Sequence, residues 1–204
     1  MKHEMKKAFT LIELLVAIGV FSILVAIGVG GFVNALHTQR QIAGFIAAQS
    51  NASVALEQMA REMRTGFLFC HDPGDPNPNA TCFPSCTVTN VSGLTSVWTC
   101  NGIMDFYNVS NENVDYALQN GELARSVTGA SGYTPITGSN IKVTSLVFTL
   151  FGSIEGDNWN PRVTISLGVS PSSSDPALAS DVLHLQTTVS ARQIDCPPGP
   201  SASC

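Results

Sequence analysis

The hydrophobic positions divide the chain into an apolar segment, an amphipathic segment and a remainder with short alternating runs. Residues 9–33 are apolar almost throughout, and Glu13 is the one charged residue among them. About 20 apolar helical residues span the hydrocarbon core of a bilayer, so this segment predicts a membrane-spanning helix. Between residues 42 and 67 apolar residues recur at steps of three or four, which is typical of one helical face. We therefore expect one helix over about residues 9–65.

The pattern after Gly66 predicts strands. Gly66 follows the last periodic residues and is a natural helix stop. Asn101-Gly102 and Asn120-Gly121 are typical of two-residue hairpin turns between strands. The expected fold class is α+β, with a long N-terminal helix packed by its second half on an antiparallel β-sheet head. The expected strands cover residues 96–99, 103–107, 114–118, 123–127, 141–143 with 146–151, 162–169 and 182–189.

Charge is distributed unevenly around the apolar segment. The 204 residues carry a net charge of -5, and only 12% of them are charged. Residues 1–8 have a net charge of +2, whereas residues 67–204 hold eleven acidic and four basic residues. Basic residues before the first apolar segment keep that end in the cytoplasm, so the remainder is expected outside. The acidity excludes a nucleic-acid-binding protein that relies on a broad basic face.

All six cysteines lie in the part that is expected outside the cytoplasm, where disulfides form. The four between residues 70 and 100 allow three connectivities, and the sequence does not choose among them. The two in the tail form the easiest pair and would close a C-terminal loop, 196–204. A zinc site that also used His71 lacks paired C-x2-C knuckles, so no metal site is expected. The disulfide candidates are Cys70, Cys82, Cys86, Cys100, Cys196 and Cys204.

The remaining candidate chemistry is sparse. Asp72, Asp75, Asn77 and Asn79 place oxygen atoms in one proline-rich loop, as calcium would require. Their spacing matches no known calcium loop, and a solvated turn is the simpler interpretation. The sequence has no phosphate-binding glycine loop, nucleophile elbow or zinc-protease motif. We therefore predict no catalytic residues, no cofactor and no enzymatic activity.

Two ordinary explanations of the N-terminal apolar segment fit less well. A secretory signal peptide has an apolar core of about 7–15 residues before its cleavage site. The segment here is longer, and residues 34–37 continue as a helix. An ordinary membrane anchor fits the length but leaves Glu13 unexplained, because an intramembrane carboxylate is costly and by default functional.

The run from Lys6 to Ile18, KKAFTLIELLVAI, resembles the prepilin signal of type IV pilins and pseudopilins. The resemblance implies that a prepilin peptidase cuts between Ala8 and Phe9 and methylates the new amine of Phe9. It also implies that Glu13 pairs with the Phe9 amine of a neighbouring subunit during assembly. One position departs from the pattern, because Ala8 stands where glycine is usual.

This resemblance also implies a division of the chain and a location. The segments are a leader peptide (1–8), a transmembrane and filament-core helix (9–33), an amphipathic helix (34–66) and a β-sheet head (67–204). The protein is then expected in the inner (cytoplasmic) membrane, with one pass, a cytoplasmic N-terminus and an outer head, and later in a filament. The implied partners are the prepilin peptidase, other pilin or pseudopilin subunits and the inner-membrane assembly platform.

A second resemblance concerns the head. The segment Leu56–Arg64, the Val-x-Tyr-x-Leu run at 114–118, Leu-x-Arg at 123–125 and the strand at 143–148 are similar to minor pilins and minor pseudopilins of the J/W group. This implies a minor structural subunit of a type IV pilus, a competence pilus or a type II secretion pseudopilus. The alternative is a tip adhesin or DNA-uptake subunit whose head binds a ligand.

Overall fold

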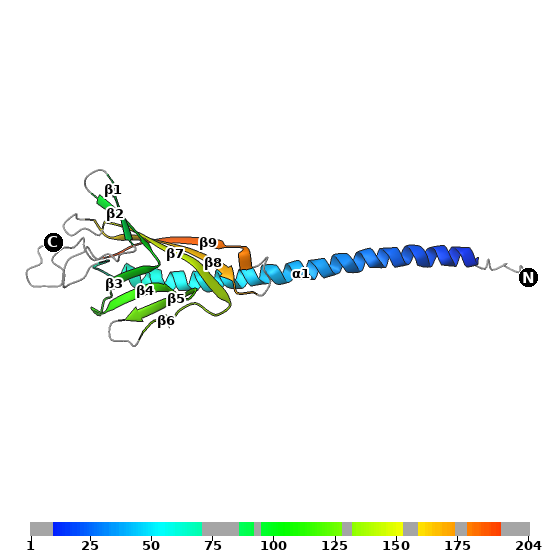
Figure 1. Cartoon of the computed structure of the whole chain (residues 1–204), viewed down its shortest axis with the longest axis horizontal. Helices are drawn as coiled ribbons and strands as arrows, with labels where there is room; N and C mark the ends of the chain where they lie inside the picture. The colour runs from blue at the N-terminus through cyan, green and yellow to red at the C-terminus, as the bar shows by residue number, and fades with distance from the viewer. Residues whose placement is uncertain are drawn as a thin grey trace, which may run out of the picture. The chain divides into compact units, whose positions relative to one another are not determined.

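The computed structural model describes residues 10–70, 86–91, 95–127, 132–152, 159–173 and 179–192. The chain forms two compact units, residues 1–43 and 44–204. The described residues form one long helix and nine strands, labelled in Figure 1. These elements are α1 (Leu11–Arg64), β1 (Cys86–Val91), β2 (Thr95–Asn101), β3 (Ile103–Tyr107), β4 (Asn113–Gln119), β5 (Glu122–Val127), β6 (Thr134–Pro135), β7 (Ile141–Phe151), β8 (Arg162–Pro171) and β9 (Leu183–Ser190).

The expected long helix is confirmed, and its end has a steric reason. α1 ends at Arg64, and the Gly66 backbone N–H donates to the Met63 carbonyl over 3.1 Å. A Cβ atom on Gly66 would lie 2.5 Å from the Phe106 ring, so only glycine fits this close approach.

The strands form two antiparallel sheets instead of the one expected sheet. One has the order β1-β2-β7-β8-β9 and the other the order β3-β4-β5-β6. The hairpin predicted at Asn101-Gly102 is wrong, because β2 and β3 belong to different sheets. The Gly102 N–H donates to Leu146 of one sheet, and its carbonyl accepts from Leu118 of the other, so the chain crosses between them here. The hairpin at Asn120-Gly121 is confirmed, with positive φ angles of 52° and 81°.

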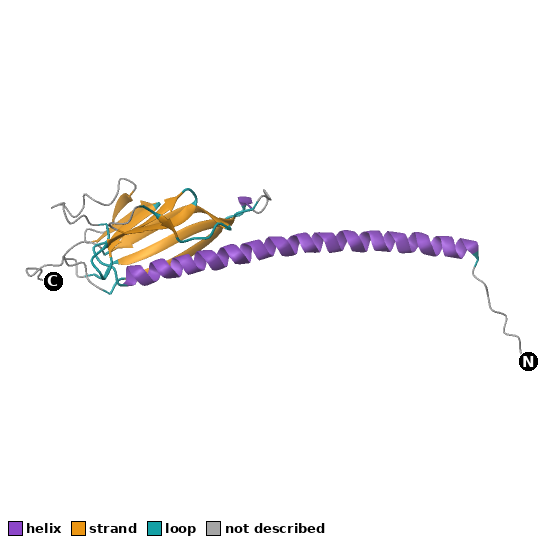
Figure 2. Cartoon of the chain, turned by 90° about the horizontal axis from the view of Figure 1, so that it is seen from below, coloured by secondary structure: helices purple, strands orange, loops and turns teal. Residues whose placement is uncertain are grey.

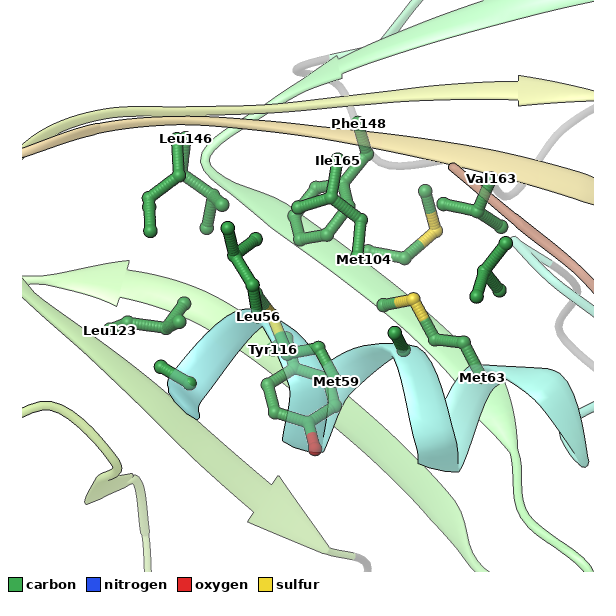
Figure 3. Packing of buried hydrophobic residues seen from close by; sticks show 14 of the residues in the cluster. Leu56, Met59, Met63, Met104, Tyr116, Leu123, Leu146, Phe148, Val163 and Ile165 are labelled. Atoms are coloured by element: carbon green, nitrogen blue, oxygen red, sulfur yellow. The ribbon is translucent and has the colours of Figure 1, made fainter. Parts of the chain in front are cut away.

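The second half of α1 packs on the strands and forms the core with both sheets. Figure 2 shows this half of the helix lying along one side of the strands. In Figure 3, Met59 and Met63 lie among side chains from β3, β4, β7 and β8. The periodicity predicted an apolar face from residue 42 onward, but the buried part of the helix begins at Ala48. Ile42 and Ile46 are exposed. The buried helix residues are Ala48, Ala52, Ala55, Leu56, Met59, Ala60 and Met63.

Candidate assembly site

The candidate site lies in the first turn of α1. The backbone N–H of Thr10 and its Oγ1 each donate a hydrogen bond of 3.1 Å to Oε2 of Glu13. In return, the Glu13 backbone N–H donates to Thr10 Oγ1 over 3.4 Å. This reciprocal arrangement is a capping box, which satisfies N–H groups that a first helical turn leaves unpaired. The T-x-x-E signature is present in the sequence, and Thr10 is a site residue that the charge pattern did not reveal.

The capping box fixes where the negative charge of Glu13 lies. Because Oε2 reaches back to the Thr10 N–H, the carboxylate is held at the N-terminal end of α1. The positive end of the helix dipole favours an anion at this position. Glu13 is nevertheless exposed, so its carboxylate remains open to a cation from another molecule.

The helix beyond this turn presents an apolar surface as far as Val33. Every residue from 10 to 40 is exposed in the structure. An 18-residue window of α1 has a mean hydropathy of 2.6 with no residue buried, so by length and composition this helix can cross a membrane. Such a surface needs either lipid or other apolar helices to cover it. The predicted cleavage and methylation residues, Ala8 and Phe9, lie outside the described residues.

A disulfide joins Cys86 in β1 to Cys100 in β2. The two residues are direct cross-strand partners, with a Cα–Cα distance of 4.0 Å. The register therefore selects a pairing that the sequence left open, and disulfides are typical of proteins outside the cytoplasm. Cys82, Cys196 and Cys204 lie outside the described residues, so the predicted Cys196–Cys204 pair stays a prediction.

The third described cysteine lies next to this disulfide. Cys70 is buried, and its Sγ is 3.7 Å from Sδ of Met104. The sulfur atoms of Cys70, Cys86 and Cys100 all lie within 4.8 Å of one another. Sulfurs bonded in a disulfide are not thiolate ligands, so the pairing of Cys86 with Cys100 removes two ligands of the zinc alternative. His71 and the oxygen-rich loop from Asp72 to Asn79 lie outside the described residues.

A charged network fastens α1 to the four-stranded sheet. Glu62 forms a salt bridge with Arg125 of β5, and both nitrogens involved, Nε and Nη2, donate to its carboxylate. The Tyr116 hydroxyl of β4 donates to Oε2 of Glu62 over 2.5 Å. These residues come from three segments that carry the resemblance to minor subunits: 56–64, 114–118 and 123–125. The network thus brings those segments together in space.

The network shifts the protonation of its members. Burial alone raises the pKa of Glu62, but the hydrogen bonds from Arg125 and Tyr116 and the charge of Arg125 hold this pKa below its usual value. Burial and the Glu62 carboxylate both raise the pKa of Tyr116. The ionised form of Glu62 is therefore the form that the fold stabilises.

Glu62→Gln is expected to lower the free energy of unfolding by about 1–2 kcal/mol at pH 7, because Arg125 and Tyr116 lose a charged partner. This estimate allows for solvent screening, since the Arg125 and Glu62 side chains are 27% and 21% exposed. Because the folded-state pKa is lowered, the contribution of Glu62 is present above about pH 4.3 and is lost as the pH falls through the folded pKa. Urea unfolding at pH 7 and pH 3 measures both effects.

Glu57→Gln is the matched control for this prediction. Glu57 pairs with Arg61 on the same helix, but their side chains are 63% and 75% exposed. Its replacement is expected to change stability by less than about 0.5 kcal/mol. If Glu62→Gln unfolds like wild type at both pH values, the network contributes no net stability and the prediction is wrong.

The comparisons with known proteins address the N-terminal segment. Residues 5–29 match the family model of the prokaryotic N-terminal methylation motif. This match supports a type IV pilin-like or pseudopilin-like protein. The matched residues contain both members of the capping box and the start of the exposed apolar helix. No curated protein and no solved structure matches the chain.

The pilin-like identity accounts for the main features of the N-terminal unit. The methylation motif implies processing by a prepilin peptidase and assembly with other pilins. The apolar helix is consistent with anchoring in a membrane before assembly. Proteins of this kind are structural subunits, and the long helix with antiparallel sheets is consistent with the pilin fold.

Proposed function

We propose that this protein is a minor structural subunit of a type IV pilus, a competence pilus or a type II secretion pseudopilus. The observation that carries the proposal is the methylation motif at residues 5–29, in which an exposed carboxylate begins an exposed apolar helix. In this proposal the protein has no enzymatic activity. Monomers wait in the inner membrane with the N-terminus in the cytoplasm and the head outside, and the assembly platform moves them into the filament.

The proposed segments follow from this role. The leader is residues 1–8, the membrane and filament-core helix is 9–33, the amphipathic helix is 34–66 and the head is 67–204. A prepilin peptidase cuts between Ala8 and Phe9 and methylates the Phe9 amine. The carboxylate of Glu13 then pairs with the Phe9 amine of a neighbouring subunit. Buried opposite charges are costly apart and attract strongly together, so each pair fixes the register between two helices.

Processing is the direct test of the proposed leader. Coexpression with a prepilin peptidase is expected to shorten the chain by eight residues and to leave N-methylated Phe9, which intact-mass and N-terminal peptide spectra measure. Ala8→Gly restores the usual residue before the cut and is expected to be processed at least as fast. Ala8→Leu is the matched control, because its larger side chain should block cleavage. A mature chain that begins elsewhere, or an uncut chain, would contradict the proposal.

A second candidate function is a tip adhesin or DNA-uptake subunit that binds a ligand through its head. The large, disulfide-containing head favours such a role over a filament core alone. The net charge of residues 67–204 disfavours phosphate-backbone binding, since acidic residues outnumber basic ones there. Deletion of residues 71–85, which precede the disulfide, separates the two roles if surface binding is lost while filaments persist.

A further inference from the structure

The outer face of the five-stranded sheet carries one uninterrupted row of threonines. Side chains alternate along each strand, so Phe148 and Leu150 enter the core while Thr149 between them faces away. In the register of the sheet, each threonine of this row is the direct partner of the next one, through all five strands. The row consists of Thr87, Thr99, Thr149, Thr164 and Thr188.

The row presents hydroxyl groups at regular intervals across the strands. Neighbouring strands lie about 4.8 Å apart, which sets the spacing of the row. The hydroxyls of Thr164 and Thr188 lie 3.0 Å apart and share a hydrogen bond. Thr87 and Thr188 at the two ends are exposed, and the three central threonines are partly exposed. Cross-strand threonine pairs stabilise sheets by themselves, so the neighbouring rows decide whether the face also binds something.

On one side of the threonines lies an uncharged row with three polar residues and one valine. It consists of Asn101, Val147, Ser166 and Gln186, which are successive cross-strand partners. A hollow of about 380 Å³ opens here. Its lining combines four polar residues, Ser145, Ser166, His184 and Gln186, with three apolar ones, Val147, Leu167 and Leu185. Hydroxyl, amide and imidazole groups can each donate and accept hydrogen bonds. The polar part of this lining therefore suits a ligand that carries neutral hydroxyl groups.

On the other side of the threonines lies an aromatic pair. Phe151 faces outward next to Thr149, and Trp159 meets its ring edge-on at a centroid distance of 6.0 Å. The Trp159 side chain is 55% exposed although it is large and apolar. An exposed ring of this kind offers an apolar platform beside the polar rows. Phe151 belongs to a third row of cross-strand partners, which consists of Thr89, Val97, Phe151, Arg162 and Ser190. Among the described residues of the three rows, Arg162 carries the one formal charge.

We propose that this outer face binds a neutral polysaccharide that lies across the strands. Sugar hydroxyls pair with the threonine row and with the polar hollow, and the apolar face of a sugar ring covers Trp159. The near-neutral charge of the face disfavours a nucleic acid or an acidic polysaccharide as the ligand. Either of these ligands would require several basic side chains. A protein partner is disfavoured because the cores of protein interfaces are depleted in serine, whereas two of the three rows on this face consist mainly of hydroxyl and amide side chains.

The proposal goes beyond the structural role, because it makes the head a binding module for a polymer outside the cell. It does not depend on the assembly chemistry of Glu13. Glu13→Ala is therefore expected to leave polysaccharide binding unchanged, so the two proposals can fail separately.

The test measures retardation of the full chain, in detergent micelles, during native electrophoresis through gels that contain hydroxyethylcellulose, xylan or galactomannan. Wild type is expected to be retarded by at least one of these neutral polymers and not by alginate, which is acidic. The triple variant Thr99→Val, Thr149→Val, Thr164→Val keeps the side-chain shape but removes three hydroxyls, and its apparent Kd is expected to rise about tenfold or more. The apparent Kd of the Trp159→Ala variant is expected to rise by a similar factor.

The controls make each outcome decisive. Thr134 is an exposed residue of β6 in the other sheet. The Thr134→Val variant is therefore expected to bind the polymers like wild type. Circular dichroism checks the fold of each variant, and if the triple variant fails to fold, Trp159→Ala decides. The proposal is overturned if no neutral polymer retards wild type, if alginate does so equally, or if the folded variants bind like wild type. It is also overturned if the triple variant loses self-association in sedimentation instead, since the face is then a contact between copies of this chain.

Discussion

Replacing Glu13 with Ala or Gln is expected to abolish incorporation of the subunit into filaments while leaving leader removal and membrane insertion intact. The proposed partner of Glu13 is the Phe9 amine of a neighbouring subunit inside an apolar bundle. Removing one member of such a buried pair typically costs about 3–5 kcal/mol, or more than a hundredfold in affinity. Immunoblots of sheared filaments, compared with the membrane fraction of the same cells, measure incorporation.

The capping box supplies the controls for this experiment. Glu13 also caps its own helix through Thr10, so Glu13→Ala removes both the charge and the side-chain acceptor of the Thr10 N–H. Glu13→Gln removes the charge but keeps an amide oxygen that can accept this hydrogen bond. Thr10→Val removes the side-chain part of the cap, about 1 kcal/mol, but keeps the carboxylate. Thr10→Ser keeps both the hydroxyl that caps the helix and the Glu13 carboxylate. If Glu13→Ala and Glu13→Gln enter filaments like wild type, the charge pair is not required, and the proposed mechanism of assembly is wrong.

Met59→Ala is expected to lower the free energy of unfolding of the head by about 2–5 kcal/mol. The Met59 side chain is fully buried, and in Figure 3 it lies within the cluster formed by α1 and both sheets. Truncation leaves a cavity that the surrounding strands can fill only in part, because close-packed cores relax incompletely. Urea unfolding of the full chain in detergent, followed by the fluorescence of buried Trp98, measures the change.

Ile46→Ala is the matched control for the core prediction. Ile46 lies on the same helix and has a similar apolar side chain, but it is 61% exposed. Its truncation is expected to change stability by less than about 0.5 kcal/mol. Equal effects at the two positions would mean that the head is not held by the core in Figure 3. A strong effect at Met59 alone would show that packing on α1 holds the head together.

The helix and one hairpin could be predicted from the sequence, because each depends on residues that are close together along the chain. The apolar period predicted α1, and the Asn120-Gly121 turn predicted the β4–β5 hairpin, since both depend on residues that are neighbours along the chain. The same turn signal failed at Asn101-Gly102. There the flanking strands find partners far away in the sequence, and the hydrogen bonds of Gly102 go to both sheets. A turn residue permits a reversal but does not decide which strands pair.

For the candidate assembly site, too, the sequence revealed one part and the structure the other. The resemblance of the run Lys6–Ile18 to the prepilin signal pointed to the methylation motif, because this signal is one short continuous stretch of sequence. The capping role of Thr10 needed the hydrogen-bond geometry of the first turn. The segment 56–64 and the hairpin residues were both noticed in the sequence. Their joining through Glu62, Arg125 and Tyr116 required the packed helix.

The resemblance of the N-terminal run to a prepilin signal pointed to a pilin-like protein. The sequence by itself also determined the long helix, an apolar segment long enough to cross a membrane and the α+β class. These properties rest on periodicity and composition over windows of neighbouring residues. The tertiary structure alone decided the split into two sheets, the Cys86–Cys100 pair and the alignment of five threonines on one face. Each of these depends on strand register, which is set by the burial of distant apolar residues against one another, and a shift of one residue would reverse every face.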